Sequence, residues 1–253
     1  ERWHCFAESI GGTEIDAVLR SNHEGTNTYE GANRWLVQHG LLQETEQQVK
    51  DRKRNAAMYK FYRWTNSLLQ ESPAAAGIRT YLASRYIDLN TLPHAAIGYY
   101  PTVKEVEQWL AENELTDIIG PEVLPERRAE FIAIGSIILF YRTSYEVFSR
   151  LKLRNINREK DGNKCTMWLG KAIRKTDKIG YFSWWIEASM DDEAVLVEGE
   201  FDVGALASMI YKEDPDAIDP IYCFSGGSNL SSGVSVLVNM GKKNIYLFPD
   251  NDG

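Results

Sequence analysis

Residues 194–253 alternate between two kinds of segment, and this alternation restricts the fold more than any other feature of the sequence. The runs "AVLV" (194–197) and "NIYLF" (244–248) are short, apolar and typical of buried strands. A helix-like stretch, "VGALASMIY" (203–211), follows the first of them. Because parallel strands need a crossover between them, the order strand, helix, strand, helix, strand predicts a parallel α/β sheet.

The segments before residue 190 have a different character. Apolar residues at helical spacing predict four helices, with Thr13 as an N-cap and with Gly40 and Ser72-Pro73 as stop signals. Their expected ranges are 13–21, 29–40, 46–71 and 76–86. Residues 131–186 are rich in β-branched and aromatic residues and contain a turn signal at Asp161-Gly162, which predicts an antiparallel sheet.

Together these patterns predict an α+β front joined to an α/β domain. The front comprises a helical segment and a mixed antiparallel sheet, and the α/β domain contains a parallel sheet. The expected segments are residues 1–45, 46–189 and 190–253. A chain of 253 residues with 43% hydrophobic residues is long enough to bury a substantial core.

Carboxylates follow two of the predicted parallel strands. Glu198 and Asp202 come after the strand at 194–197, and Asp250 and Asp252 come after the strand at 244–248. Ligands collect at the carboxyl ends of parallel strands, so neighbouring strands would bring the four acids together. Clustered carboxylates repel one another unless a cation neutralises them, and oxygen ligands favour Mg²⁺ or Mn²⁺. The simpler interpretation is an acidic helix N-terminus and an ordinary turn.

A basic segment lies within an acidic chain. Residues 141–178 contain eleven Lys or Arg and four Asp or Glu, whereas the whole chain has a net charge of −8. This distribution argues against general nucleic-acid binding and indicates one local anion-binding surface. A solvated charged hairpin is the alternative.

Cysteine usage and hydropathy indicate the cellular compartment in which the protein is expected. The three cysteines, Cys5, Cys165 and Cys223, are far apart and odd in number, which favours a reduced, cytosolic protein. We find no apolar run long enough to span a membrane and no leader sequence, so we expect a cytoplasmic protein without membrane contact.

Two motifs and their flanking segments resemble a known family. "LVEGEFDVGALAS" followed by "LFPDNDG" resembles the TOPRIM fold, which has a strand-end Glu in an E-G-x-x-D context and a later D-x-D. "RWHCFAESIGGTEIDAVLR" and "AAAGIRTYLASRYIDLNTLPHAAIGYYP" resemble the zinc-ribbon end and the core entry of DnaG-type bacterial and phage primases. The basic segment resembles the region that precedes TOPRIM in these primases. The resemblance also implies that the parallel sheet of the α/β domain is truncated at its C-terminal end.

The resemblance implies an enzyme, a DNA primase that acts as a DNA-directed RNA polymerase. Such an enzyme makes RNA primers on single-stranded DNA by metal-dependent nucleotidyl transfer with Mg²⁺ or Mn²⁺. It implies catalytic roles for Glu198, Asp250 and Asp252, and metal ligation by these three residues and Asp202. Nucleotide or DNA phosphates would be bound by Arg154, Lys164, Lys171, Arg174 and Lys178.

The resemblance also implies partners, and the sequence differs from the family pattern at one position of the zinc ribbon. The expected partners are the single-stranded DNA template, nucleoside triphosphates and a replicative helicase, in a phage or mobile element. Glu8 stands where the family's zinc ribbon has its next cysteine after Cys5, so we expect a degenerate or truncated ribbon that binds no zinc.

Two other functions use the same features. A TOPRIM nuclease or topoisomerase would cleave DNA at the acidic site. A non-catalytic DNA-binding module linked to a helicase would bind DNA in a salt-dependent way without nucleotide incorporation. The tryptophans Trp168, Trp184 and Trp185 are expected to be core residues, with base stacking as the alternative.

Overall fold

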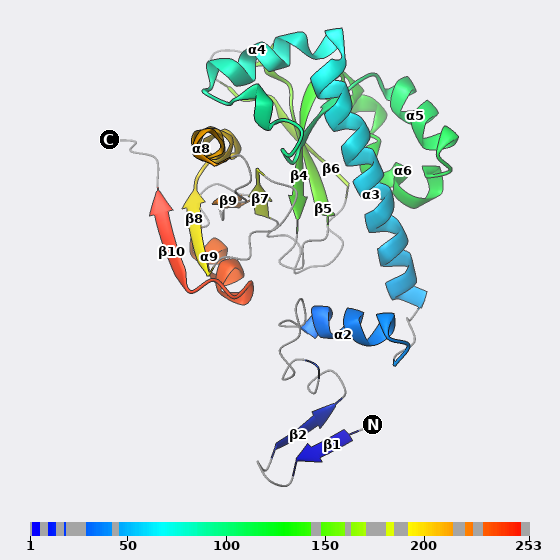
Figure 1. Ribbon diagram of the computed structural model, residues 1–253. Coiled ribbons are helices and arrows are strands. Elements are labelled where there is room, and N and C mark those ends of the chain that lie inside the picture. Colours follow the sequence, from blue (N-terminus) through cyan, green and yellow to red (C-terminus); the bar gives the residue numbers. More distant parts are fainter. Residues whose placement is uncertain are drawn as a thin grey trace. The chain divides into compact units, whose positions relative to one another are not determined.

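The computed structural model forms two compact units, residues 1–53 and 54–253 (Figure 1). The helix α3 (Glu46–Glu71) crosses the boundary between them. The three segments expected from the sequence, residues 1–45, 46–189 and 190–253, stay predictions. The structure describes residues 2–5, 10–13, 18, 29–41, 46–142, 148–159, 163–170, 181–184, 192–214, 221–224 and 230–248.

The first unit contains a strand pair and a helix. β1 (Arg2–Cys5) and β2 (Ile10–Thr13) pair antiparallel, and Thr13 is the last residue of β2. Its predicted role as a helix cap stays a prediction, because residues 14–17 lie outside the described residues. Most of the predicted helix 13–21 lies outside the described residues. α2 (Tyr29–Gln38) confirms the next predicted helix, and Gly40, with a φ of +69°, adopts the left-handed conformation that ends it.

The second unit is built on one mixed sheet. Its described strands follow the order β10-β8-β9-β7-β4-β5-β6, and β3 also pairs with β4. The strands are β3 (Ile97–Tyr100), β4 (Ser136–Arg142), β5 (Phe148–Arg154), β6 (Thr166–Leu169), β7 (Tyr181–Ser183), β8 (Glu193–Val197), β9 (Ile221–Phe224) and β10 (Asn244–Phe248).

The sheet has a parallel part and an antiparallel part, as predicted. β8 pairs in parallel with both β9 and β10, and β4, β5 and β6 pair antiparallel. The prediction did not anticipate that the two parts form one sheet. The short strand β7 joins them, because it pairs antiparallel with β9 on one side and with β4 on the other.

Helices cover this sheet, and α3 (Glu46–Glu71) and α4 (Ala76–Ser84) confirm two of the predicted helices. α3 has the predicted bounds, since Ser72-Pro73 stops it. No described helix is both long enough and apolar enough to cross a bilayer. The remaining α-helices are α5 (Val103–Glu112), α6 (Thr116–Val123), α7 (Glu130–Ala133), α8 (Glu200–Glu213) and α9 (Leu230–Asn239). The short 3₁₀ helices are η1 (Pro73–Ala75), η2 (Leu89–Thr91), η3 (Arg127–Ala129) and η4 (Ile156–Arg158).

The core lies between α3 and the antiparallel strands. Phe61 and Tyr62 of α3 contact the ring of Phe140 on β4, and Tyr62 and Phe140 also contact Phe148 on β5. All four side chains are at most 3% exposed. Burial of aromatic rings in such edge-to-face and tilted contacts is a large source of stability.

Gly204 allows α8 to pack against Trp184. Trp184 is fully buried, and its indole N–H donates a hydrogen bond to Thr91 Oγ1 at 3.1 Å. A Cβ atom at position 204 would lie 2.5–2.9 Å from three atoms of the Trp184 ring. Because the hydrogen bond and the surrounding core hold the ring, a methyl group there has no room.

We therefore predict that Gly204→Ala lowers the free energy of unfolding by about 1–3 kcal/mol, because it overpacks the core. The control is Gly77→Ala in α4, where a Cβ atom would meet no atom within 4 Å. That variant should be more stable than the wild type by about 0.5–1 kcal/mol, since alanine favours helices. Urea unfolding measures both. A Gly204→Ala protein as stable as Gly77→Ala would contradict the prediction.

Candidate active site at the ends of the parallel strands

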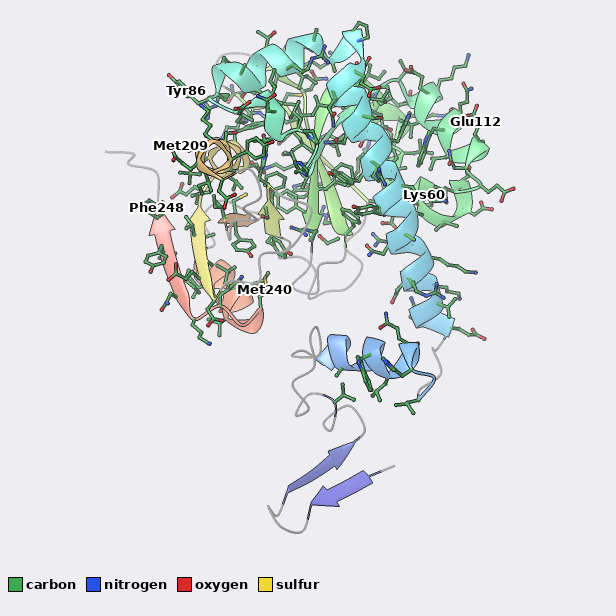
Figure 2. All side chains as sticks on the ribbon, in the orientation of Figure 1. Lys60, Tyr86, Glu112, Met209, Met240 and Phe248 are labelled. Carbon is green, nitrogen blue, oxygen red and sulfur yellow. The ribbon has the colours of Figure 1, made fainter. Side chains whose placement is uncertain are left out.

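β8 and β10 end level with each other. In their parallel pairing Val197, the last residue of β8, lies opposite Phe248, the last residue of β10 (Figure 2 labels Phe248). Glu198 follows β8 directly and is half-buried. Convergence of the four acids requires β8 and β10 to be neighbours, and the pairing confirms that they are. Asp250 and Asp252, which come next after β10 in the sequence, lie outside the described residues.

Gly199 brings Asp202 close to the turn that carries Glu198. A Cβ atom at position 199 would collide with Asp202 Oδ2, so a larger residue there would displace that carboxylate. The backbone N–H of Asp202 also donates to the Gly199 carbonyl oxygen at 3.2 Å, which begins α8. The E-G-x-x-D spacing thus places two carboxylates around one tight turn.

The two described acids have different surroundings. Arg85, at the end of α4, places Nη2 3.9 Å from Asp202 Oδ1, with both side chains about half exposed. Within the described part of the chain, the carboxylate of Glu198 has no hydrogen-bond or ion-pair partner. A half-buried carboxylate without a partner favours a nearby cation.

The donor chemistry of this turn fits a divalent cation with oxygen ligands. Glu198 and Asp202 supply two carboxylates, and the described residues contain no group of three or more metal-ligating side chains. The remaining predicted ligands, Asp250 and Asp252, lie outside the described residues. Arg85 was not predicted as a site residue, because its proximity to Asp202 depends on how α4 packs and leaves no signal in the local sequence.

Three basic residues form a stripe along β5. Arg150, Lys152 and Arg154 alternate with the buried Leu151 and Leu153, so they share one face of the sheet. We call Arg150, Lys152 and Arg154 the basic stripe. Sequence reasoning selected only Arg154 from it, although the period-2 pattern of "RLKLR" in a predicted strand was the signal for all three.

Arg154, predicted to bind phosphate, already has an acidic partner. Its Nε donates to Glu159 Oε1 at 2.7 Å and its Nη2 donates to Glu159 Oε2 at 3.2 Å. The guanidinium also lies 4.7 Å from the centre of the Phe201 ring. The two-pronged donor that would clamp a phosphate is therefore occupied by Glu159 in this structure.

Lys152 is paired with Glu200 in the first turn of α8. The Lys152 ammonium forms an ion pair with Glu200 Oε1, and the Tyr141 hydroxyl donates to the same oxygen at 2.6 Å. Burial acts to raise the pKa of Glu200, but the Lys152 charge and the hydrogen bonds outweigh it, so the pKa lies below its usual value. Glu200 is therefore a charged residue held inside the protein.

Arg150 differs from the other two residues of the stripe. Its guanidinium stacks over Trp168, 4.5 Å from the ring centre, and its Nε has no hydrogen-bond partner among the described residues. Burial lowers the pKa of Arg150. Arg150 is thus the residue of the basic stripe that has no described acidic partner.

The structure describes only some of the other predicted site residues. Lys164 is exposed, and Lys171, Arg174 and Lys178 lie outside the described residues. Trp184 is a core residue, as expected, whereas Trp168 is half-buried beneath Arg150 and Trp185 is not described. Cys165 and Cys223 are free thiols.

Solved structures resemble this chain. The Aquifex aeolicus primase, with its zinc-binding and RNA polymerase domains, matches with a TM-score of 0.61 and 20% identity, covering 100% of this chain. The RNA polymerase domain of Mycobacterium tuberculosis DnaG matches with a TM-score of 0.56 and 17% identity, covering 82% of this chain and 68% of that one.

A DnaG primase catalytic domain bound to single-stranded DNA matches with a TM-score of 0.55 and 16% identity, covering 83% of this chain and 63% of that one. The chain has the fold of the DnaG-type primase catalytic core. This confirms the resemblance at the level of the fold. The chain spans 60% of the length of the Aquifex primase structure. No protein-family model matches the sequence, and no curated protein sequence does.

Proposed function

We propose that the chain is the catalytic core of a DnaG-type primase, which makes short RNA primers on single-stranded DNA. The observation that carries the proposal is the level pairing of β8 and β10 within this fold. It brings the end of the strand before Glu198 next to the end of the strand before Asp250 and Asp252 in the sequence. Convergence of these acids is what metal-dependent nucleotidyl transfer requires.

In the proposed reaction the 3′-hydroxyl of one nucleotide attacks the α-phosphorus of the next. A new O–P bond forms, the bond from the α-phosphorus to the bridging oxygen breaks, and pyrophosphate leaves. Glu198 acts as a metal ligand or as the base that accepts the hydroxyl proton, and Asp202, Asp250 and Asp252 are the other proposed ligands. Mg²⁺ or Mn²⁺ held by these carboxylates would stabilise the charge that develops on the phosphate oxygens.

We propose that the basic segment binds the template and the nucleoside triphosphates. Arg150, stacked on Trp168 and without a described acidic partner, is suited to contact a phosphate or a base. Arg154, which would have to exchange Glu159 for a phosphate, is also a proposed phosphate contact. The other proposed contacts are the exposed Lys164 and, outside the described residues, Lys171, Arg174 and Lys178. A solved DnaG catalytic domain of similar fold is bound to single-stranded DNA, which supports this assignment. A phage or mobile-element origin and a helicase partner are also proposed.

A primer-synthesis assay with the full chain tests the function. We expect labelled RNA products that require single-stranded template, nucleoside triphosphates and Mg²⁺ or Mn²⁺, as measured on denaturing gels. Metal-dependent nicking of DNA without nucleotides would instead favour TOPRIM cleavage. DNA binding that weakens with salt, without incorporation in any divalent ion, would overturn the proposal in favour of a binding module.

A further inference from the structure

We propose that Glu200 is a positioning residue for the candidate metal site and is not itself a metal ligand. In this role it fixes the first turn of α8 to β5 and β4, and so orients the carboxylates of Glu198 and Asp202. The proposal rests on the proposed function, because it assumes that these two carboxylates bind the cation. It assigns a role to an acid that lies between the two predicted ligands in the sequence.

The contacts of Glu200 are directed toward the sheet. Its Oε1 accepts from the Tyr141 hydroxyl on β4 and pairs with the Lys152 ammonium on β5, and its side chain is 14% exposed. Residues two positions apart on a helix do not face the same way. Asp202 lies instead against Gly199 and near Arg85, on the more exposed side of the turn.

The first turn of α8 lacks the usual means of fixing a helix start. Gly199 is the N-cap and provides no side-chain hydrogen bond to the helix. Contacts with β5 take the place of this cap, since Lys152 pairs with Glu200 and Arg154 lies over the ring of Phe201. Two residues of the basic stripe therefore anchor two successive residues of α8.

This anchoring bears on the metal site because the ligands are so near. Glu198 and Asp202 each lie two residues from Glu200, and a shift of the first turn would move both carboxylates. Buried ion pairs contribute little net stability compared with apolar packing, so stability alone is a weak reason for such a pair. Groups that orient metal ligands, by contrast, typically change metal affinity about 10–100-fold when they are removed.

The test measures Mn²⁺ binding directly, by isothermal titration calorimetry with Mn²⁺ alone, in Glu200→Gln. We expect the Mn²⁺ dissociation constant to rise about 10-fold or more, with circular dichroism and the unfolding midpoint close to those of Lys152→Gln. Glu213→Gln, an exposed acid at the other end of α8, is the matched control and should bind Mn²⁺ like the wild type. An unchanged dissociation constant in Glu200→Gln would overturn the proposal.

The double variant Lys152→Gln/Glu200→Gln separates positioning from direct ligation. Two amides can hydrogen-bond to each other without stranding a buried charge, so we expect the double variant to recover much of the Mn²⁺ affinity that Glu200→Gln loses. If Glu200 were a ligand, Lys152→Gln would give no rescue, and this outcome would overturn the assignment.

Glu198→Gln distinguishes failure of this inference from failure of the proposed function. If it abolishes Mn²⁺ binding while Glu200→Gln has no effect, the metal site stands and only the positioning role is wrong. If Glu198→Gln leaves Mn²⁺ binding unchanged, Glu198 is not a metal ligand, and the positioning role, which assumes that it is, is wrong with it.

Discussion

Glu198→Gln should lower the rate of primer synthesis about 10³-fold or more while the chain remains folded. Glu198 follows β8 at the point where β8 and β10 end together, and its carboxylate has no described polar partner that the substitution would break. Glutamine has nearly the same size but no negative charge. It can neither accept the hydroxyl proton nor bind a divalent cation as a carboxylate does.

The measurement is the initial rate of nucleotide incorporation on single-stranded template, together with the unfolding midpoint. Glu193→Gln is a matched control, because Glu193 is an exposed acid at the opposite end of the same strand. This control should retain primer synthesis. Equal primer yields from Glu198→Gln and the wild type would remove Glu198 from the mechanism.

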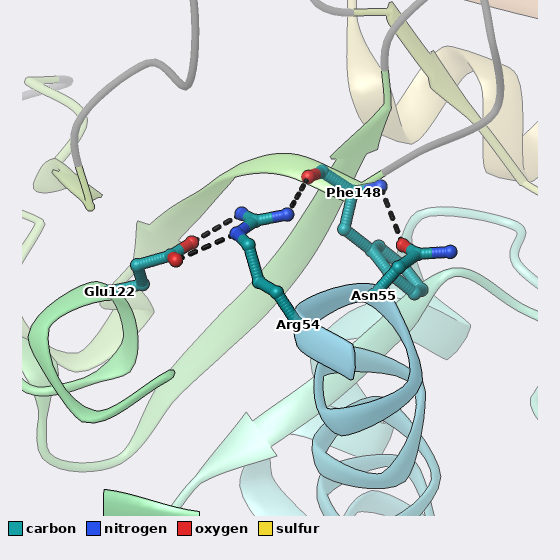
Figure 3. Close-up of polar contacts among 4 residues, drawn as sticks. All are labelled: Arg54, Asn55, Glu122 and Phe148. Atoms are coloured by element: carbon teal, nitrogen blue, oxygen red, sulfur yellow. Dashed lines mark hydrogen bonds and ion pairs between the residues drawn. The ribbon is translucent and has the colours of Figure 1, made fainter. Parts of the chain in front are cut away.

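Arg54→Met should lower the free energy of unfolding by up to about 3 kcal/mol, because it breaks a partly buried ion pair; a fully buried pair typically costs about 3–5 kcal/mol when broken. Arg54 Nε donates to Glu122 Oε1 at 2.7 Å, its Nη2 pairs with Glu122 Oε2, and its Nη1 donates to the Phe148 carbonyl oxygen at 2.8 Å (Figure 3). The two side chains are 11% and 23% exposed. The substitution leaves the Glu122 charge without its partner.

Asn55 completes this connection between α3 and β5. Its Oδ1 accepts a hydrogen bond from the Phe148 N–H at 3.2 Å, so neighbouring residues of α3 hold both backbone groups of Phe148 (Figure 3). Loss of Arg54 therefore also weakens the attachment of the start of β5 to the helix that covers it.

Urea unfolding of three variants tests the Arg54 prediction. Arg54→Met/Glu122→Gln removes both charges and should be less destabilised than Arg54→Met alone, because no unpaired charge stays buried. Arg128→Ala breaks an exposed pair with Glu126, 86% and 73% exposed, and should change stability by less than about 1 kcal/mol. An effect of Arg54→Met as small as that of Arg128→Ala would contradict the prediction.

Local patterns in the sequence predicted the types of many elements. The apolar spacing and the Ser72-Pro73 stop gave the bounds of α3, and the alternation of strands and helices after residue 193 gave the parallel order of β8, β9 and β10. These predictions succeeded because helix and strand periods, stop signals and crossover rules act over a few residues.

Charged contacts between distant segments were not predictable in the same way. The structure pairs Lys152 with Glu200, 48 residues away, and this contact was not predicted. The phosphate contact expected of Arg154 stays a prediction, and the structure shows Arg154 paired with Glu159. Arg85 near Asp202 was missed as well. Which opposite charges meet depends on strand register and on how helices pack, and neither is encoded in local spacing.

The sequence alone therefore determined that a parallel α/β segment ends its strands in carboxylates and that a basic segment precedes it. Only the tertiary structure decided that β7 joins the parallel and antiparallel parts into one sheet, and that two of the three cations on β5 are neutralised by acids. The physical reason is the separation, along the sequence, of the residues that interact. Element type follows from residues a few positions apart, whereas the continuity of the sheet through β7 and the pairing of Lys152 with Glu200 depend on contacts between residues far apart in the chain.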